Sequence, residues 1–451
     1  MKTVSETIFA LATPPGRGAV AVLRLSGPGS GEALDTLAGA RPQPRMASIR
    51  RLKDAAGATL DEALVLWFPA PGSYTGEDGA ELQLHGGRAV VEAVAGRLVE
   101  LGLRLAEPGE FTRRAFERGR LDLTQAEAIA DLVDAETEAQ RRQALDQLGG
   151  ALARRYGVWR EALVDCLALL EAEIDFPDEN LPERLSTAVG PRLDTVISEI
   201  DSALGDAARG ERVRDGWRVA VIGPPNAGKS SLFNRLVRRE AAIVTPHAGT
   251  TRDVIEASFD LGGYRVLIAD TAGLRDSTDP IEAEGVRRAR NWAAQAALRI
   301  WVVGATDEMS DLEEGLDLLR AGDLLVLNKA DRSGPPTHSA MSRALVARVR
   351  TTLRVSAKTG EGLETLCDLL AGRAAEDLSG ADFPAVTRER HRRRLGEARS
   401  HLERGRAVLT TAAELAAEDL RLAARCLGRV AGRVDPEDVL DAVFARFCIG
   451  K

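Results

Sequence analysis

The sequence predicts a multidomain protein that combines α/β regions with an all-α region. Its 451 residues suffice for two to four domains. Three stretches of different composition follow one another. The first is rich in Gly and Pro and extends to about Arg118, and the second contains few of these residues and extends to about Arg214. From Trp217 onward, apolar runs alternate with helical stretches. Helical texture returns after about Thr387. We therefore expect one helical domain interrupted by an inserted α/β domain.

The composition excludes several classes of protein. Acidic residues outnumber basic ones by 68 to 60, and the net charge of −8 excludes a globally basic nucleic-acid coat, although not a local basic patch. No apolar run approaches about 18 residues and the N-terminus lacks a signal-peptide pattern, so we expect neither a membrane-spanning helix nor export. The cysteines are far apart, which argues against a disulfide framework or a zinc site and favours a reducing cytoplasm. They are Cys166, Cys367, Cys426 and Cys448.

The composition of the first two stretches predicts strands in the first and helices in the second. In the N-terminal stretch, Ala19–Leu25 and Ala63–Phe68 are short apolar runs between turn-forming residues, as strands are. In the second stretch the apolar residues recur near the 3.6-residue helical period, and Asp175-Phe-Pro-Asp178 interrupts the pattern. The residues of this period are Leu121, Leu123, Ala128, Ile129, Leu132 and Val133, and later Leu163, Leu167 and Leu170.

The third stretch predicts buried parallel strands, because each apolar run is short and followed by a turn. Near the end of the chain, Asp435 and Pro436 supply the N-cap and first residue of a last helix. The expected strands are Val219–Ile222, Val266–Ala269, Ile300–Val303, Leu324–Leu327 and Leu353–Val355, and the apolar face of the last helix would carry Val439, Leu440, Val443 and Phe444.

A phosphate-binding loop follows the first of these strands. Gly223-Pro-Pro-Asn-Ala-Gly-Lys-Ser230 fits G-x-x-x-x-G-K-[ST] and lies between a strand and a helix, as the pattern requires. Its glycines let backbone N–H groups surround phosphates at a helix N-terminus. Lys229 would reach the β- and γ-phosphates, and Ser230 would bind Mg²⁺.

Four further elements predict a GTPase rather than an ATPase. Thr251 offers a second hydroxyl to Mg²⁺, and Asp270, which opens Asp270-Thr-Ala-Gly273, is placed to hold the ion through water. Asp331, in Asn328-Lys-Ala-Asp331, can accept hydrogen bonds from the guanine N1–H and exocyclic amine, a donor pair that adenine lacks. Ser356-Ala-Lys358 can cover the guanine O6. A degenerate homologue without activity is disfavoured, because every phosphate-binding residue is present.

The residue that positions the attacking water is absent from its usual place. Many small GTPases carry Gln directly after the motif that corresponds to Asp270-Thr-Ala-Gly273. This chain has Leu274 there, whose side chain cannot form hydrogen bonds. Hydrolysis must therefore use another polar group, and Arg275–Glu284 is the nearest source. Glu282 and Glu284 are its carboxylates with helical sequence behind them, although spacing alone favours solvent-facing helix residues.

At this point the chain resembles the MnmE (TrmE) family of tRNA-modification GTPases over nearly its whole length, from Thr7 to Lys451. Beside the GTPase motifs, the resemblance rests on Ala12-Thr-Pro-Pro-Gly-Arg-Gly18, Tyr74-Thr-Gly-Glu-Asp78, Pro108-Gly-Glu-Phe-Thr112, Leu121-Asp-Leu-Thr-Gln-Ala-Glu-Ala128 and Phe447-Cys-Ile-Gly-Lys451.

The resemblance implies a domain organisation and a GTP site. The domains would be a folate-binding and dimerisation domain (1–118), a helical domain in two parts (119–214 and 376–451), and an inserted P-loop GTPase domain with a Ras-like doubly wound sheet (215–375). Motifs and resemblance together assign GTP binding to Asn226, Ala227, Gly228, Lys229, Ser230, Ser231, Thr245, Thr250, Thr251, Asp270, Thr271, Ala272, Gly273, Asn328, Lys329, Asp331, Ser356, Ala357 and Lys358.

The resemblance also implies ions and a catalytic carboxylate. Ser230 and Thr251 would bind Mg²⁺. In the family, K⁺ beside the phosphates does the work of an arginine finger. Its ligands here would be Asn226, Thr245, Thr250 and His247, the last through its backbone carbonyl. Glu282 falls where the family keeps the carboxylate that acts on the attacking water through a bridging water, so the resemblance favours Glu282 over Glu284.

For folate, the resemblance implies Arg24, Glu81, Arg120 and Lys451. A carboxylate can pair with pterin amines and cations can bind the glutamate tail, although by sequence alone Arg24 and Glu81 are typical surface residues at strand ends. Some family members have Lys in place of Arg120, so a planar guanidinium here replaces a compact ammonium group. Cys448 would be a functional thiol near the folate, whereas a buried structural cysteine is the default interpretation.

The predicted function is that of a cytoplasmic, homodimeric, potassium-stimulated GTPase that uses GTP and Mg²⁺. With the FAD-containing partner MnmG it would add an aminomethyl or carboxymethylaminomethyl group to C5 of the wobble uridine (position 34) of certain tRNAs. The one-carbon unit would come from 5,10-methylenetetrahydrofolate, for which 5-formyltetrahydrofolate is an analogue.

Two alternatives stay open. The basic run Arg388-Glu-Arg-His-Arg-Arg-Arg394 is compatible with tRNA phosphates or with a solvated helix start. A different class of function is a regulatory ribosome-assembly GTPase that binds rRNA without modification chemistry. The folate-like N-terminal region and the absence of a recognisable K homology module speak against that class.

Overall fold

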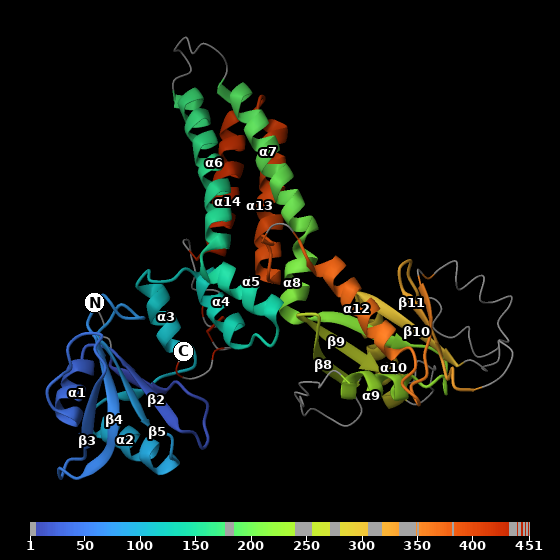
Figure 1. The fold of residues 1–451 in the computed structure, drawn as a ribbon. Coiled ribbons are helices and arrows are strands. Elements are labelled where there is room, and N and C mark those ends of the chain that lie inside the picture. Colours follow the sequence, from blue (N-terminus) through green and yellow to red (C-terminus); the bar gives the residue numbers. More distant parts are fainter. Residues whose placement is uncertain are drawn as a thin grey trace, which may run out of the picture. The chain divides into compact units, whose positions relative to one another are not determined.

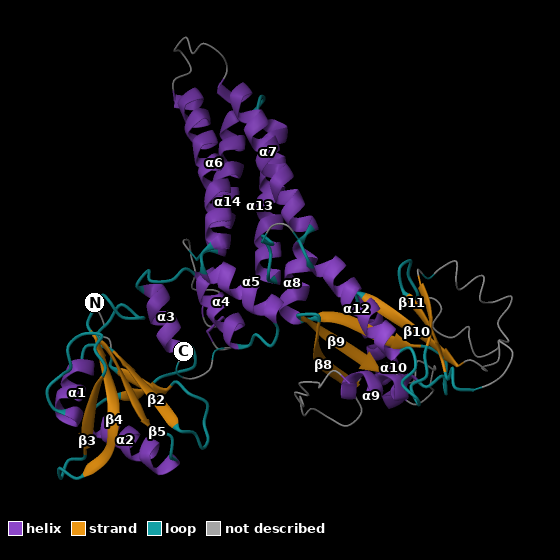
Figure 2. Ribbon diagram, in the orientation of Figure 1, coloured by secondary structure: helices purple, strands orange, loops and turns teal. Residues whose placement is uncertain are grey.

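The computed structural model describes residues 6–175, 185–239, 255–270, 280–304, 318–332, 349, 351–380, 383–432, 440, 443, 444, 447 and 450. By their contacts, the residues form two compact units. The first comprises Met1–Val133, Gln147–Val196 and Glu397–Lys451, and the second comprises Asp134–Asp146 and Ile197–Gly396. Figure 1 labels the helices and strands, and Figure 2 distinguishes the two classes by colour.

The first unit contains a six-stranded sheet in the order β3-β4-β5-β2-β1-β6. Neighbouring strands are antiparallel except β1 and β6, which are parallel. Two helices cover one face through Leu34, Leu37, Val94 and Leu98, which pack against the sheet in one apolar cluster. The elements are β1 (Ile8–Leu11), β2 (Val20–Ser26), α1 (Ser30–Ala38), β3 (Ser48–Lys53), β4 (Thr59–Phe68), β5 (Gly79–His85), α2 (Arg88–Glu100) and β6 (Arg104–Leu105).

Helices make up the rest of the first unit. In the long helix α6, the apolar face predicted from Leu163, Leu167 and Leu170 is buried, which confirms that periodicity. Ion pairs tie neighbouring helices together: Arg421 bonds Glu171 at 2.9 Å and Arg406 bonds Asp194 at 2.8 Å. The helices are α3 (Glu110–Glu117), α4 (Leu123–Val133), α6 (Ala151–Asp175) and α14 (Ala413–Val430), with parts of α5 (Glu138–Leu148), α7 (Leu185–Gly205) and α13 (Glu389–Val408).

The end of the chain contributes to the same unit. Leu440, Phe444 and Phe447 are buried in a cluster with Leu123, and Val443 is partly buried against it. These positions confirm three of the four residues predicted for the apolar face of the last helix. The fourth, Val439, lies outside the described residues.

The second unit is built on another six-stranded sheet, in the order β12-β11-β10-β7-β9-β8. Four of the five predicted apolar runs lie wholly within its strands, and the fifth, Leu353–Val355, overlaps the end of β12. These strands pair in parallel, as expected. The sixth strand, β8, pairs antiparallel with β9 and was not predicted. The strands are β7 (Trp217–Ile222), β8 (Ile255–Leu261), β9 (Tyr264–Asp270), β10 (Leu298–Gly304), β11 (Leu324–Asn328) and β12 (Thr351–Arg354).

Helices cover both faces of this second sheet. On one face, Phe233 and Leu236 of α9 (Lys229–Arg239) and Leu366 and Leu370 of α12 (Leu363–Leu378) join the apolar cluster of Val219 and its neighbours. On the other face, alanines of α10 (Pro280–Gln295) pack against Trp301 and Ile222. The sheet is therefore doubly wound, and the predicted fold class, α/β regions with an all-α region, is confirmed.

One buried ion pair supports this sheet from within. The Arg299 and Asp323 side chains are 3% and 2% exposed, and Arg299 Nε donates to Asp323 Oδ2 at 2.7 Å. The same guanidinium also donates to the backbone carbonyls of Ala293 and Ala296. Because both charges are hydrogen-bonded, their burial between β10 and the end of α10 is tolerated.

The described cysteines are buried and form no disulfide within the described residues: they are Cys166, Cys367 and Cys426. Among the described helices, none combines the length and the apolar character needed to cross a membrane.

Candidate functional site

The predicted phosphate loop lies at the carboxyl end of β7, and α9 begins at Lys229. Its conformation depends on residues that adopt positive φ: Asn226 at 61°, Gly223 at 142° and Gly228 at 90°. A Cβ on Gly223 would lie 2.2 Å from the carbonyl oxygen of Val302, so glycine is required there. The Lys229 ammonium donates to the carbonyl of Pro224 at 2.8 Å, which closes the loop around the lysine.

The carboxylate predicted to hold Mg²⁺ stands next to this loop. Asp270 ends β9, and its register partner is Val221 of β7. The side chain is 5% exposed, and its Oδ1 has no hydrogen-bonding partner within the described residues. A buried carboxylate oxygen without a protein donor fits an ion or ion-bound water as its partner. Ser230 is exposed in the first turn of α9.

The guanine-binding elements meet the phosphate loop through one side chain. Asn328, at the end of β11, donates from Nδ2 to the carbonyl of Ala227 at 2.9 Å. Its Oδ1 accepts from the backbone N–H of Ala357 at 3.1 Å. Asn328 is 1% exposed, so it bridges three loops from inside the protein.

The acceptor for guanine is held by the same group of loops. Ser356 Oγ donates to Asp331 Oδ1 at 2.6 Å. This hydrogen bond, together with the nearby Lys358, lowers the pKa of Asp331. The carboxylate is therefore ionised at neutral pH and can accept hydrogen bonds from a base.

The structure brings Asn226–Ser231, Asp270, Asn328, Lys329, Asp331 and Ser356–Lys358 to the carboxyl ends of neighbouring strands. Glu282 and Glu284 both lie near the start of α10. The remaining predicted residues lie outside the described part of the chain: Thr245, His247, Thr250, Thr251, Thr271, Ala272, Gly273, Cys448 and Lys451.

We expect Gly228→Ala to weaken GDP binding by about tenfold to several hundredfold, because strain and a displaced hydrogen bond cost a few kcal/mol. The new Cβ would lie 2.3 Å from Asn328 Nδ2, at a φ of 90°. Fluorescent-GDP titration measures the loss. Gly372→Ala is the control, because no atom lies within 4 Å of its Cβ position. Equal affinity of Gly228→Ala and wild type would contradict the role of Asn328.

A second site lies in the first unit, on the sheet that carries Arg24 and Glu81. These residues are opposite each other in β2 and β5, and Arg24 Nη2 lies 3.0 Å from Glu81 Oε1. The guanidinium lies over the rings of Tyr74 and Phe111, at 5.5 and 6.0 Å from their centroids. Together they line a cavity of about 160 Å³.

Sequence reasoning missed the aromatic walls of this cavity. Tyr74 belongs to a motif noted in the sequence, but only the fold brings it to Arg24. Its hydroxyl is hydrogen-bonded to Thr112 at 2.8 Å, and burial raises the pKa of Tyr74, so the phenol is neutral. Arg120 is exposed and does not line the cavity.

Glu77, which was also not predicted, fixes the loop that carries Tyr74. Its side chain is 4% exposed and accepts hydrogen bonds from Arg114, at 3.0 Å, from Arg118, and from Ser26, at 2.9 Å. A buried carboxylate that accepts hydrogen bonds from this many donors holds its surroundings rigidly. The motif Tyr74–Asp78 is therefore partly a structural clamp for the cavity.

The basic run 388–394 is largely engaged within the second unit. His391 is fully buried and lies 3.3 Å from the Thr387 hydroxyl. Arg392 pairs with Glu211. These contacts favour a structural role for the run over tRNA binding.

Two protein-family models match the chain. Residues 123–448 match the model of the MnmE helical domain, and residues 7–120 match that of the GTP-binding protein TrmE N-terminus. The tRNA modification GTPase MnmE of Caulobacter vibrioides is 56% identical over 448 residues, which cover 99% of this chain and all of the relative. The protein of that name from Paramagnetospirillum magneticum is 54% identical over 449 residues, with 99% and 100% coverage. Among solved structures, a variant of Aquifex aeolicus Era bound to GDP and AlF₄⁻ aligns with 37% of this chain and 57% of its own, at 24% identity and a TM-score of 0.30.

Proposed function

The chain belongs to the MnmE family of tRNA modification GTPases, and from this premise we propose that it modifies C5 of the wobble uridine together with an FAD-containing partner, MnmG. The protein is a GTP hydrolase that takes part in tRNA modification. The added group would be aminomethyl or carboxymethylaminomethyl. GTP hydrolysis would not be the group transfer itself but would drive closing and opening of paired GTPase domains in a homodimer.

The cavity in the first unit is the observation that carries this proposal. The cavity beside Arg24 and Glu81 lies in a different unit from the GTP-binding loops. It combines a carboxylate, a guanidinium and two aromatic rings, which suit a flat, nitrogen-rich pterin. When bound, a tetrahydrofolate would supply the one-carbon unit. Glu81 would accept hydrogen bonds from the pterin amines, and Arg24 would orient that carboxylate.

The GTP site fits the ions that the family uses. Asp270 offers an unpartnered buried oxygen, and Ser230 an exposed hydroxyl, to Mg²⁺ and its waters. Asn226 is exposed and makes no side-chain hydrogen bond within the described residues, so its amide oxygen is available to K⁺. A potassium ion there would supply positive charge beside the phosphates. We assign the remaining K⁺ ligands to Thr245, His247 and Thr250, and the second Mg²⁺ hydroxyl to Thr251. The carboxylate that acts on water is assigned to Glu282.

The domain organisation follows the same premise. We propose folate binding and dimerisation by residues 1–118, a helical domain from 119–214 and 376–451, and an inserted GTPase domain from 215–375. Outside the cavity lining, we assign further folate contacts to Arg120 and Lys451, with Cys448 as a functional thiol. The setting would be the cytoplasm, where the tRNA substrate and GTP are both present.

The proposal is tested by nucleoside mass spectrometry of total tRNA from cells that lack the gene. Complementation with wild type should restore C5-substituted wobble uridines, and complementation with Cys448→Ser should not. If the deletion leaves wobble uridines unchanged, modification is excluded. A ribosome-assembly GTPase that binds rRNA without modification chemistry would then be the better description.

For the folate site, we expect Glu81→Ala to weaken binding of 5-formyltetrahydrofolate by about ten- to a hundredfold, the loss of hydrogen bonds to a charged acceptor. Isothermal titration calorimetry of the full chain measures it. Glu62→Ala is the control, because Glu62 is exposed on β4 of the same sheet, with its carboxylate 3.5 Å from Arg51. Equal loss in both variants, or none in either, would remove the folate assignment.

A further inference from the structure

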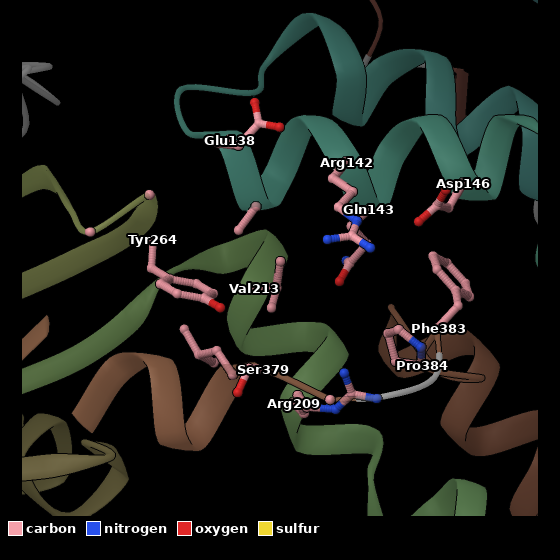
Figure 3. A pocket seen from close by; sticks show the side chains of 15 residues that line it. Glu138, Arg142, Gln143, Asp146, Arg209, Val213, Tyr264, Ser379, Phe383 and Pro384 are labelled. Atoms are coloured by element: carbon pink, nitrogen blue, oxygen red, sulfur yellow. The ribbon is translucent and has the colours of Figure 1, made fainter. Parts of the chain in front are cut away.

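A second cavity, of about 300 Å³, lies in the second unit and has no assigned ligand (Figure 3). Its walls are the first turns of α5, the helix α8 (Ala207–Asp215), the turn between β8 and β9, and the chain that follows α12. None of the predicted GTP-binding residues lines it. The volume is at the lower end of the range for small-molecule sites.

Specific hydrogen bonds between its walls hold the cavity open. The backbone N–H of Ala139 donates to the carbonyl of Gly263 at 3.0 Å, which joins α5 to the turn of the β8–β9 hairpin. The Gln143 side chain donates to the carbonyl of Gly210 on α8, also at 3.0 Å. Glu136 and Arg265 add an ion pair of 3.2 Å. The walls therefore form one connected structure rather than a loose surface crevice.

Two guanidinium groups from opposite walls point into this space: Arg142 from α5 and Arg209 from α8 (Figure 3). Arg209 is 14% exposed and is held by Asp206 through a bond of 2.7 Å from Nε. Its Nη1 lies 2.4 Å from where a Cβ of Gly380 would be, so a glycine at 380 leaves room for the guanidinium. Arg142 forms no hydrogen bond or ion pair within the described residues. Asp206 beside Arg209 and Glu138 near Arg142 offset part of the positive charge, and the two guanidinium groups still present N–H donors to an oxyanion.

The remaining lining has two further properties. Val213, Leu378, Phe383 and Pro384 give it an apolar surface on which a flat body can lie. At the end near Phe383, the Asp146 carboxylate points into the cavity (Figure 3) and has no hydrogen-bonding partner within the described residues. A carboxylate there disfavours a bare anion and favours a ligand with its own N–H or O–H donor.

We propose that this cavity binds a small organic anion of about mononucleotide size. Its anionic group lies between Arg142 and Arg209, its flat body on Phe383 and Pro384, and its donor at Asp146. The ligand also touches the turn of a hairpin whose strand β9 ends at Asp270. Occupancy of the cavity therefore stiffens the hairpin that leads to the nucleotide site.

Uridine 5′-monophosphate carries each required feature and lacks the guanine donor pair, so it is a suitable probe. Titration calorimetry of the full chain saturated with GDP, whose phosphates fill the phosphate loop, should show binding. Arg142→Ala should weaken that binding at least tenfold. Ser379→Trp, a change at an exposed lining residue, should abolish it by filling the cavity.

Arg212→Ala is the matched control, because Arg212 lies on α8, which forms one wall, and does not itself line the cavity. Its binding of the nucleotide should equal that of wild type. Inorganic phosphate is titrated in parallel, and equal affinity for phosphate would exclude a role for the organic body. No binding of the mononucleotide, or binding that Arg142→Ala and Ser379→Trp both leave unchanged, would overturn the proposal.

Discussion

Exchange of potassium for sodium in the assay should lower the rate of GTP hydrolysis by about a thousandfold, since the cation replaces an arginine finger worth roughly 10³–10⁵ in rate. The proposed site contains the amide oxygen of Asn226, which lies in the phosphate loop with a backbone φ of 61°. Oxygen ligands at fixed positions discriminate between the ions by size, because sodium is smaller and retains its water more strongly. Phosphate release at matched ionic strength measures the effect.

Asn226→Gly provides the internal comparison for that experiment, because glycine removes the amide and still adopts the positive φ of 61°. It should hydrolyse GTP slowly in either salt, while binding GDP nearly as wild type does, because Asn226 forms no side-chain hydrogen bond within the described residues. Equal wild-type rates in potassium and sodium would remove the ion from the proposal.

Glu282→Ala should retain GTP affinity and lose turnover by about 10²–10⁴-fold, the usual contribution of a group that manages a proton in the transition state. Leu274 cannot position water, so a carboxylate from α10 is the proposed substitute. Its place near the start of α10 is also favourable for a negative charge. Single-turnover hydrolysis, with GTP affinity measured separately, distinguishes lost chemistry from lost binding.

Glu284→Ala is the matched control, since it removes the same charge two residues farther along α10. It should keep turnover close to that of wild type. If Glu282→Ala stays within about threefold of wild type, the carboxylate assignment is wrong. If Glu284→Ala alone loses turnover, the role belongs to Glu284.

Much of the fold was predictable because its signals are local. Buried parallel strands are continuous apolar runs, and Val219–Ile222 or Leu324–Leu327 could be recognised without any knowledge of their neighbours. The phosphate loop is equally local, because its glycines, its lysine and its flanking strand and helix are consecutive in the chain. The strand β8 was missed because it lies at the sheet edge, where Glu256 and Asp260 face solvent and break up the apolar run. Alternation of Ala257, Phe259 and Leu261 was the available signal.

The candidate sites were predictable only in part, because their contacts are distant in sequence. Arg24 and Glu81 are paired by the register of β2 and β5. The sequence around them does not indicate that Tyr74 and Phe111 line the same cavity. In the same way, the contact of Asn328 with Ala227 spans about a hundred residues and depends on the order of the strands. A sequence motif identifies the residues that carry a chemical group. Which side chains lie next to them in the folded protein depends on the order and register of the strands.

The hydrogen bonds by which Asn328 joins three loops affect how the GTP site is refilled with nucleotide. Hydrogen bonds between protein groups alone join the phosphate loop, the base-recognition loop and the loop that begins at Ser356. Their conformational entropy is lost once, when the chain folds, and not again at every reloading. A site that keeps its shape between rounds refills by diffusion from the cellular pool of guanine nucleotides. The pace of tRNA modification would then follow the GTP to GDP ratio, and with it the energy state of the cell.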